Sequence, residues 1–280
     1  MKQSRIIVSG AILAAIACSL ATARASVVVT ISDPGTSTPA LGSSNYSQLG
    51  VTGYVTETFD ELPTGDNTGV LTSASSGMTF TPTTATDYAD IASSPTGSGY
   101  DIIAADQYGG AGGTGNYMAV GSETGGTETN SVLITLPEEE SYFGFWDSAS
   151  DGGNVITLLD NGTVLTTLNA QQVIDVVNAQ PDSSQYYGNP YDSGADSGEP
   201  FSFINFFGTS GTTFDQVLIT ETPGTAGFEY DNPSIADTYT SIGGTAVVTP
   251  EPGPMVSLSL GALLLGGLIV SRRRNLAKLS

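Results

Sequence analysis

The chain has 280 residues, with 28 Asp and Glu against 7 Lys and Arg, no His and one Cys. All seven basic residues lie within the first 24 or the last nine positions. Glu251 is the only one of the 28 acidic residues outside positions 26–250, so that segment holds 27 carboxylates and no basic side chain. This distribution excludes several classes of protein before any motif is considered.

The missing cations restrict both binding and catalysis. Phosphate and nucleic-acid recognition depend largely on Arg and Lys, so we expect no nucleic-acid partner. A Ser-His-Asp triad needs His, and a Ser-Lys pair needs Lys. We therefore expect no enzyme, although a glycoside hydrolase, which needs only two carboxylates, stays open as an alternative. The expected counter-ions are solvent cations, above all Ca²⁺ or Mg²⁺, which prefer oxygen ligands.

Residues 1–25 have the three parts of a secretory signal peptide. A basic start precedes an apolar run at 6–20, and Ala23 and Ala25 form a small-x-small cleavage site. We expect signal peptidase to cut after Ala25. Cleavage would remove Cys18, the only Cys, and leave a chain without disulfides. Lipidation of Cys18 is the alternative.

The body of the chain carries the pattern of many short strands. Runs rich in β-branched and aromatic residues recur between clusters of Gly, Pro, Asn, Asp and Ser. Strands are expected at Val27–Ile31, Tyr54–Phe59, Met78–Thr81, Asp101–Ala104, Tyr117–Val120, Val132–Leu136, Tyr142–Trp146, Val155–Leu159, Thr163–Leu168, Phe201–Phe207, Gln216–Thr220 and Phe228–Tyr230.

Two local signals in this region are specific. Asn161-Gly162 separates two β-rich runs and tolerates positive φ at both turn positions, which predicts a hairpin. Asn169, with Gln172 three residues later and an apolar run following, predicts the N-cap of a short helix.

These elements predict an all-β fold, a jelly-roll-like β-sandwich over residues 26–237. Residues 238–249 are poor in apolar side chains and are expected to form an extended linker. The sequence thus predicts one extracellular domain between a signal peptide and a C-terminal segment, with a second small domain within the body as the alternative.

The C-terminal segment, 250–276, has three parts in a fixed order. Pro250-Glu251-Pro252 comes first, then an apolar run at 255–270, then Arg272-Arg273-Arg274. Sixteen residues span roughly 24 Å as a helix, slightly less than a bilayer core. We expect one transmembrane helix at 255–270 with the Arg cluster on the cytoplasmic side. A buried core helix is the alternative.

This order closely resembles the PEP-CTERM sorting signal of bacterial surface proteins. The resemblance implies an inner-membrane-anchored precursor, processing by an exosortase near Pro250-Glu251-Pro252, and delivery to the cell surface or extracellular matrix. It covers about the last thirty residues and gives an address rather than an activity.

A second resemblance covers about residues 140–235. The segments Tyr142–Trp146, Phe201–Phe207 and Gly227–Asn232 are similar to those of exosortase-dependent surface proteins with a lectin-like body. We therefore expect a structural or adhesive protein of a polysaccharide matrix. The alternative is a carbohydrate-binding, lectin-like module. The acidic insert Asp182–Glu199 departs from the family pattern.

Several carboxylates are candidate Ca²⁺ ligands. Asp147 and Asp151 match part of an EF-hand loop, and Asp192 with Asp196 repeats that spacing, but both loops lack the remaining ligands. Solvated turns are the alternative for both. The architecture of jelly-roll carbohydrate modules suggests a second group at the first and last strands. Its three members are Glu57, Asp60 and Asp231.

Two further groups need an interpretation. Glu138-Glu139-Glu140 follows Pro137 and is expected to be a solvated charge run in a turn, with a metal cup or a catalytic pair as the alternative. Three Tyr in one polar loop are candidates for stacking on sugar rings, with simple loop packing as the alternative: Tyr186, Tyr187 and Tyr191. The aromatic residues of Tyr142–Trp146 and Phe201–Phe207 are expected to be core.

Overall fold

The computed structural model describes residues 26–39, 50–51, 53–83, 99–121, 130–221 and 227–249. The expected signal peptide with Ala23 and Ala25, the transmembrane segment 255–270 and the sorting residues lie outside these ranges. Those sorting residues are Pro250, Glu251, Pro252, Arg272, Arg273 and Arg274. Within the described ranges, no helix is long and apolar enough to cross a membrane.

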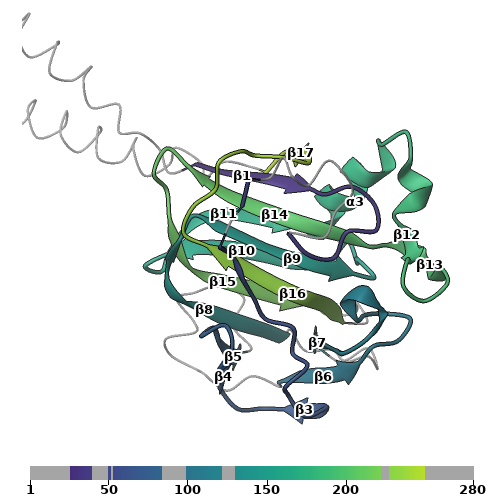
Figure 1. Cartoon of the computed structure of the whole chain (residues 1–280), viewed down its shortest axis with the longest axis horizontal. Helices are drawn as coiled ribbons and strands as arrows, with labels where there is room; N and C mark the ends of the chain where they lie inside the picture. The colour runs from purple at the N-terminus through teal and green to yellow at the C-terminus, as the bar shows by residue number, and fades with distance from the viewer. Residues whose placement is uncertain are drawn as a thin grey trace, which may run out of the picture.

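The described residues form an all-β protein, as the sequence predicts, and every strand pairing among them is antiparallel (Figure 1). In this part of the chain the larger sheet has nine strands. Their order is β17 (Thr245–Val247), β1 (Ser26–Ile31), β14 (Ser202–Thr209), β9 (Tyr142–Ser148), β16 (Phe228–Ala236), β7 (Asn116–Val120), β6 (Tyr100–Ala104) and β3 (Gly65–Asn67), with β2 (Val55–Thr56) paired to β16.

A smaller sheet lies against the larger one. Among the described residues it has six strands, in the order β11 (Thr163–Asn169), β10 (Val155–Asp160), β15 (Phe214–Glu221), β8 (Asn130–Glu140), β5 (Thr79–Thr83) and β4 (Leu71–Thr72). A separate hairpin joins β12 (Tyr187–Asn189) to β13 (Ala195–Pro200). The helical elements of the described ranges are η2 (Ala111–Gly113), α3 (Ala170–Asn178) and η3 (Ser183–Gln185).

The two sheets share one hydrophobic core, which makes the fold sandwich-like. Phe143, Phe145 and Phe206 of the larger sheet belong to the same buried cluster as Ile134 and Val217 of the smaller sheet. Phe145 lies 6.0 Å from the Tyr230 ring and 6.4 Å from the Phe206 ring, measured between centroids. Alternate residues of the central strands face this core, as the pleat requires: Phe143 and Phe145 of β9, and Ile204 and Phe206 of β14.

The outer face of the larger sheet is also covered, which explains why β9 is apolar at nearly every position. Trp146 packs there with Ala149, Phe201 and Phe203, and Tyr191 contacts this group. The residues Tyr142, Phe207 and Ala236 form another such cluster. All residues of β9 are consequently buried, and the expected core aromatics are confirmed.

Both specific local predictions are confirmed. β10 and β11 form the hairpin, with φ of 47° at Asn161 and 75° at Gly162. Helix α3 begins after Asn169, whose side chain accepts from the Gln171 amide while the Gln172 side chain accepts from the Asn169 amide. Val173 and Val177 of this helix enter the core.

The segment 238–249 differs from the expected extended linker. Its strand β17 pairs with β1 at the edge of the larger sheet, and Val247 is buried. The Tyr239 hydroxyl also donates to the Gly208 carbonyl at 2.9 Å. Strand pairing of this kind depends on an unpaired edge next to the segment, and composition alone does not reveal that edge.

Candidate functional site

Five carboxylates gather at one end of strands β9 and β16, beside the hairpin β12–β13. We call this group the buried acidic cluster. Its members are Asp147, Asp151, Asp196, Glu199 and Glu229, and their charges act on one another. The cluster combines the predicted Asp147 and Asp151 with residues from two other strands.

Backbone pairing brings these segments together. Glu229 of β16 lies opposite Ser148 of β9 in the antiparallel register, and the Ser148 hydroxyl donates to the Glu229 carbonyl at 3.2 Å. The Ser150 amide donates to the Pro200 carbonyl at 3.0 Å, which joins the loop after β9 to the end of β13. The acidic side chains of three separate strands are therefore held in one region.

Asp147 is the most deeply placed member. It lies two residues after Phe145 in β9, so the strand pleat continues the core-facing row, and it is fully buried. Neither carboxylate oxygen accepts a hydrogen bond from the described residues. Burial is the main cause that raises the pKa of Asp147 to about 7. The Asp151 charge adds to this effect, and the nearby Ser150 hydroxyl opposes it without reaching hydrogen-bond geometry.

Glu229 is also buried, and its pKa lies well above the usual range. Burial is the main cause, and the charges of Asp151, Glu199 and Asp147 add to it. Gly227, with φ of 135°, makes room for this side chain: a Cβ there would lie 2.4 Å from Glu229 Oε1. The backbone thus accommodates a carboxylate in a place where its charge is costly.

Asp196 and Glu199 belong to β13 and are half-buried. The pKa of Glu199 is raised by burial first, and then by a hydrogen bond and charge repulsion from Asp196. One carboxylate oxygen of Asp196 is buried and has no hydrogen-bond partner within the described chain. A hydrogen bond between two carboxyl groups requires that one of them carry a proton.

Three uncharged oxygens in these segments are buried and without partners among the described residues: Ser150 Oγ, Asn154 Oδ1 and Ser202 Oγ. Ser202 lies directly opposite Asp147 in the pairing of β14 with β9. Buried polar atoms are nearly always hydrogen-bonded, so their number here marks an unusual site. Since residues 26–250 contain no basic side chain, only protons or dissolved cations can neutralise it.

The cluster is spread out rather than arranged as one ligand cage. Within the described residues, three carboxylates with oxygens all within 4.8 Å of one another occur only at Glu138, Glu140 and Asp237. Three members of the buried acidic cluster, Asp147, Glu199 and Glu229, have raised pKa values, which favour the protonated form of these carboxyl groups.

The other predicted metal group, Glu57, Asp60 and Asp231, is brought into one neighbourhood. Burial is the main cause that raises the pKa of Asp231, and the charges of Asp60 and Glu57 contribute. The oxygens of these carboxylates nevertheless accept hydrogen bonds from loop backbone amides and from hydroxyls. Glu57 accepts from the Phe59 amide at 2.9 Å, and Asp231 accepts from the Ala111 amide at 2.7 Å. Asp60 accepts from the Asn116 amide at 2.9 Å.

The three candidate sugar-stacking Tyr do not share an exposed face. Tyr186 is buried in the main core, and its hydroxyl donates to the Ser32 carbonyl at 2.9 Å. Tyr187 is half-buried and donates to Asn178 Oδ1. Tyr191 packs edge-on against Trp146 with ring centroids 5.7 Å apart, and its hydroxyl donates to the Gly35 carbonyl. These contacts favour the alternative interpretation, in which the three Tyr side chains pack the loop against the body.

Sequence reasoning missed Glu199 and Glu229 as members of the cluster. Glu229 lies between the buried Phe228 and Tyr230, and a carboxylate inside an apolar run was the available signal. Glu199 has no such signal, because β13 becomes part of the site only through the fold.

No family model matches the chain, and no curated protein matches it. The functional argument therefore rests on the residues themselves.

Proposed function

We propose that this protein is exported and sorted to the cell surface or extracellular matrix, where it has a structural or adhesive role among polysaccharides. The signal peptide directs export, and an exosortase processes the C-terminal segment near Pro250-Glu251-Pro252. A jelly-roll arrangement of the two sheets belongs to the same proposal. The proposal assigns no catalytic role to the body.

The observation that carries this proposal is the distribution of charge along the chain. Every basic residue lies in the two terminal segments, and the 225 residues between them contain 27 carboxylates without one cation. Basic residues beside apolar runs are the pattern of export and membrane-orientation signals.

The body suits a passive surface role. Its two sheets share an aromatic core, and loops bury aromatic residues on the outer face of the larger sheet. Its many carboxylates give a polyanion that requires dissolved cations, which an extracellular matrix supplies. Such a domain could persist outside the cell without disulfides.

The test is expression of the full chain in a Gram-negative bacterium with and without an exosortase. In its presence, the intact mass of surface-released protein should lack both the apolar N-terminal segment and Arg272–Arg274. Replacement of Pro250-Glu251-Pro252 by three Ala should leave the protein in the inner-membrane fraction.

Either of two results would reject the proposal. One is released protein that retains the three Arg. The other is protein that stays in the cytoplasm with its first 25 residues intact. Binding of released protein to a glycan array would instead favour the carbohydrate-binding alternative.

A further inference from the structure

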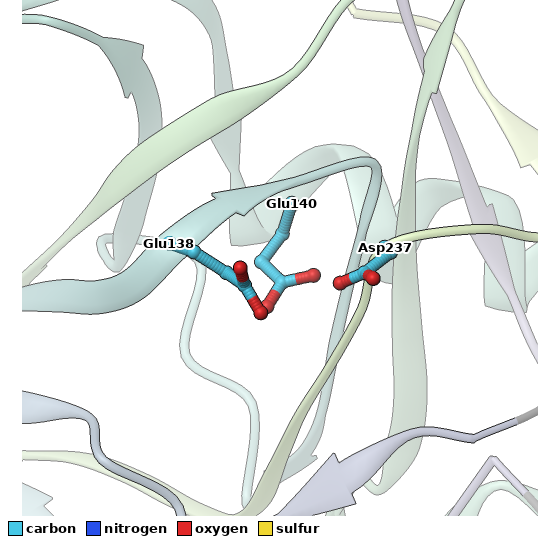
Figure 2. Close-up of side chains that lie close together, drawn as sticks. All are labelled: Glu138, Glu140 and Asp237. Atoms are coloured by element: carbon cyan, nitrogen blue, oxygen red, sulfur yellow. The ribbon is translucent and has the colours of Figure 1, made fainter.

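A second group of carboxylates lies at the opposite end of β9 and β16 from the buried acidic cluster. Glu138 and Glu140 are at the end of β8, and Asp237 directly follows β16. Figure 2 shows the Glu140 carboxylate between those of Glu138 and Asp237. Seven residues of β9 separate the two ends, a distance of about 20 Å at 3.3 Å per residue.

The backbone explains why these three side chains meet. Glu138 and Glu140 are two positions apart in a strand, so they project from the same face. The turn residue Ser141 holds the third: its amide donates to the Ala236 carbonyl at 3.2 Å, and its hydroxyl donates to the Asp237 carbonyl at 2.6 Å. The charge run expected in a turn is therefore the end of a strand in contact with another strand.

Glu139 lies between Glu138 and Glu140 in the strand, but its side chain does not belong to this group of carboxylates. Its Oε2 accepts from the Thr213 hydroxyl at 3.0 Å. It carries the same charge in the same strand, on the opposite face, and so provides a matched control.

The spacing of the three carboxylates fits a calcium ion. One oxygen from each lies within 4.8 Å of the other two. Ca²⁺ binds oxygens at 2.3–2.6 Å, so two of its ligands can be about 5 Å apart at most. Mg²⁺ demands near-ideal octahedral geometry and dehydrates reluctantly, so an irregular group of three carboxylates favours Ca²⁺.

The burial of Glu140 is a second, independent observation at this site. Glu140 is only 3% exposed, and its Oε2 is buried without a hydrogen-bond partner in the described part of the chain. Residues 26–250 contain no basic side chain that could neutralise the negative charge of Glu140. Glu138 and Asp237 are exposed, so water can reach the site and complete a coordination shell.

We propose that Glu138, Glu140 and Asp237 form a Ca²⁺ site that ties the two sheets together. Glu138 and Glu140 belong to the smaller sheet, whereas Asp237 leaves the larger one. A cation held by all three links the sheets at the point where the chain crosses from β8 to β9. The inference does not depend on export or on matrix binding.

The test compares four variants of the full-length chain in non-ionic detergent at pH 8: Glu138→Gln, Glu140→Gln, Asp237→Asn and the control Glu139→Gln. Ca²⁺ binding is measured by equilibrium dialysis, and thermal unfolding is measured in Ca²⁺ and in Mg²⁺ at equal ionic strength. Wild type should bind with a Kd on the order of 10⁻⁴–10⁻³ M, the range of extracellular modules. At ten times Kd, the folded-to-unfolded ratio should rise about tenfold.

The three site variants should weaken this binding by about tenfold or more, because each removes one of three charged ligands. Glu139→Gln should bind like wild type. Glu140→Gln should melt higher than wild type in chelator, because it removes a buried charge, and should lose the Ca²⁺ response.

Two results would overturn the site. The first is an equal loss in Glu138→Gln and Glu139→Gln, which would show diffuse attraction to a charged strand. The second is equal melting temperatures of wild type in Ca²⁺ and Mg²⁺, which would show general screening.

Discussion

Asp147 offers a direct measurement of what a buried carboxylate costs this fold. Its pKa is raised from 3.8 to about 7, chiefly by burial. Below pH 4, Asp147 is protonated in both the folded and the unfolded state and costs nothing. Between pH 4 and pH 7 the unfolded state loses its proton while the folded state keeps it, so stability falls as pH rises.

The size of the effect follows from the pKa difference. Each pH unit corresponds to about 1.4 kcal/mol, so the full cost above pH 7 is at most about 4 kcal/mol. From pH 5 to pH 7 the loss should be roughly 2 kcal/mol, because the folded state itself begins to ionise near pH 7. Asp147→Asn keeps the shape but cannot ionise, so it should lack this part of the pH dependence.

The assay is urea unfolding at pH 5, 6, 7 and 8 in the presence of a chelator. Trp146 is the only Trp, is fully buried and precedes Asp147, so its fluorescence reports on unfolding at the site. At pH 8 the Asn variant should be more stable than wild type, and at pH 5 the difference should be much smaller. Asp192→Asn removes an exposed carboxylate from the same acidic chain and serves as the control.

The reasoning would be refuted if wild type and Asp147→Asn lost stability in parallel from pH 5 to pH 8. It would also be refuted by an Asn variant less stable than wild type at pH 8. The first outcome would mean that folding leaves the pKa of Asp147 unchanged, and the second would mean that the fold stabilises its charged form.

Four further predictions concern packing, local structure and charge. Phe145→Ala should lower the free energy of unfolding by about 3–5 kcal/mol, because the ring is fully buried among core aromatics; a loss below 1 kcal/mol in urea unfolding would be inconsistent with this packing. Asn169→Ala should cost about 1 kcal/mol through loss of the helix cap, whereas Asn169→Ser should retain most of it. Gly162→Ala should cost about 1–2 kcal/mol, because φ is 75° there, and an unchanged melting temperature would contradict the turn. Finally, the melting temperature at pH 8 should rise between 10 mM and 500 mM NaCl, because salt screens 27 uncompensated carboxylates; a fall would contradict the electrostatic argument.

Local patterns predicted the individual elements well where the signal was short in range. The Asn161-Gly162 turn and the Asn169 cap are each specified by a few adjacent residues, and both occur as predicted. The short strands β3, β4, β12, β13 and β17 were missed, because each has few apolar residues and pairs only with a neighbour that the fold supplies. The same reason applies to residues 238–249, whose composition resembles a linker although β17 completes a sheet edge.

The sequence by itself determined the class of fold, the charge of the body and the absence of any basic partner for its carboxylates, because these depend only on composition and short-range periodicity. The tertiary structure alone decided which carboxylates are costly. Glu138 and Glu139 are adjacent and chemically identical, yet one meets Glu140 and Asp237 while the other faces Thr213. Asp147 and Asp192 start similar motifs, yet one is fully buried and the other is exposed. Burial and charge repulsion depend on distances between strands far apart in the chain, and those distances are set by the pairing of β8, β9, β13 and β16 rather than by any local pattern.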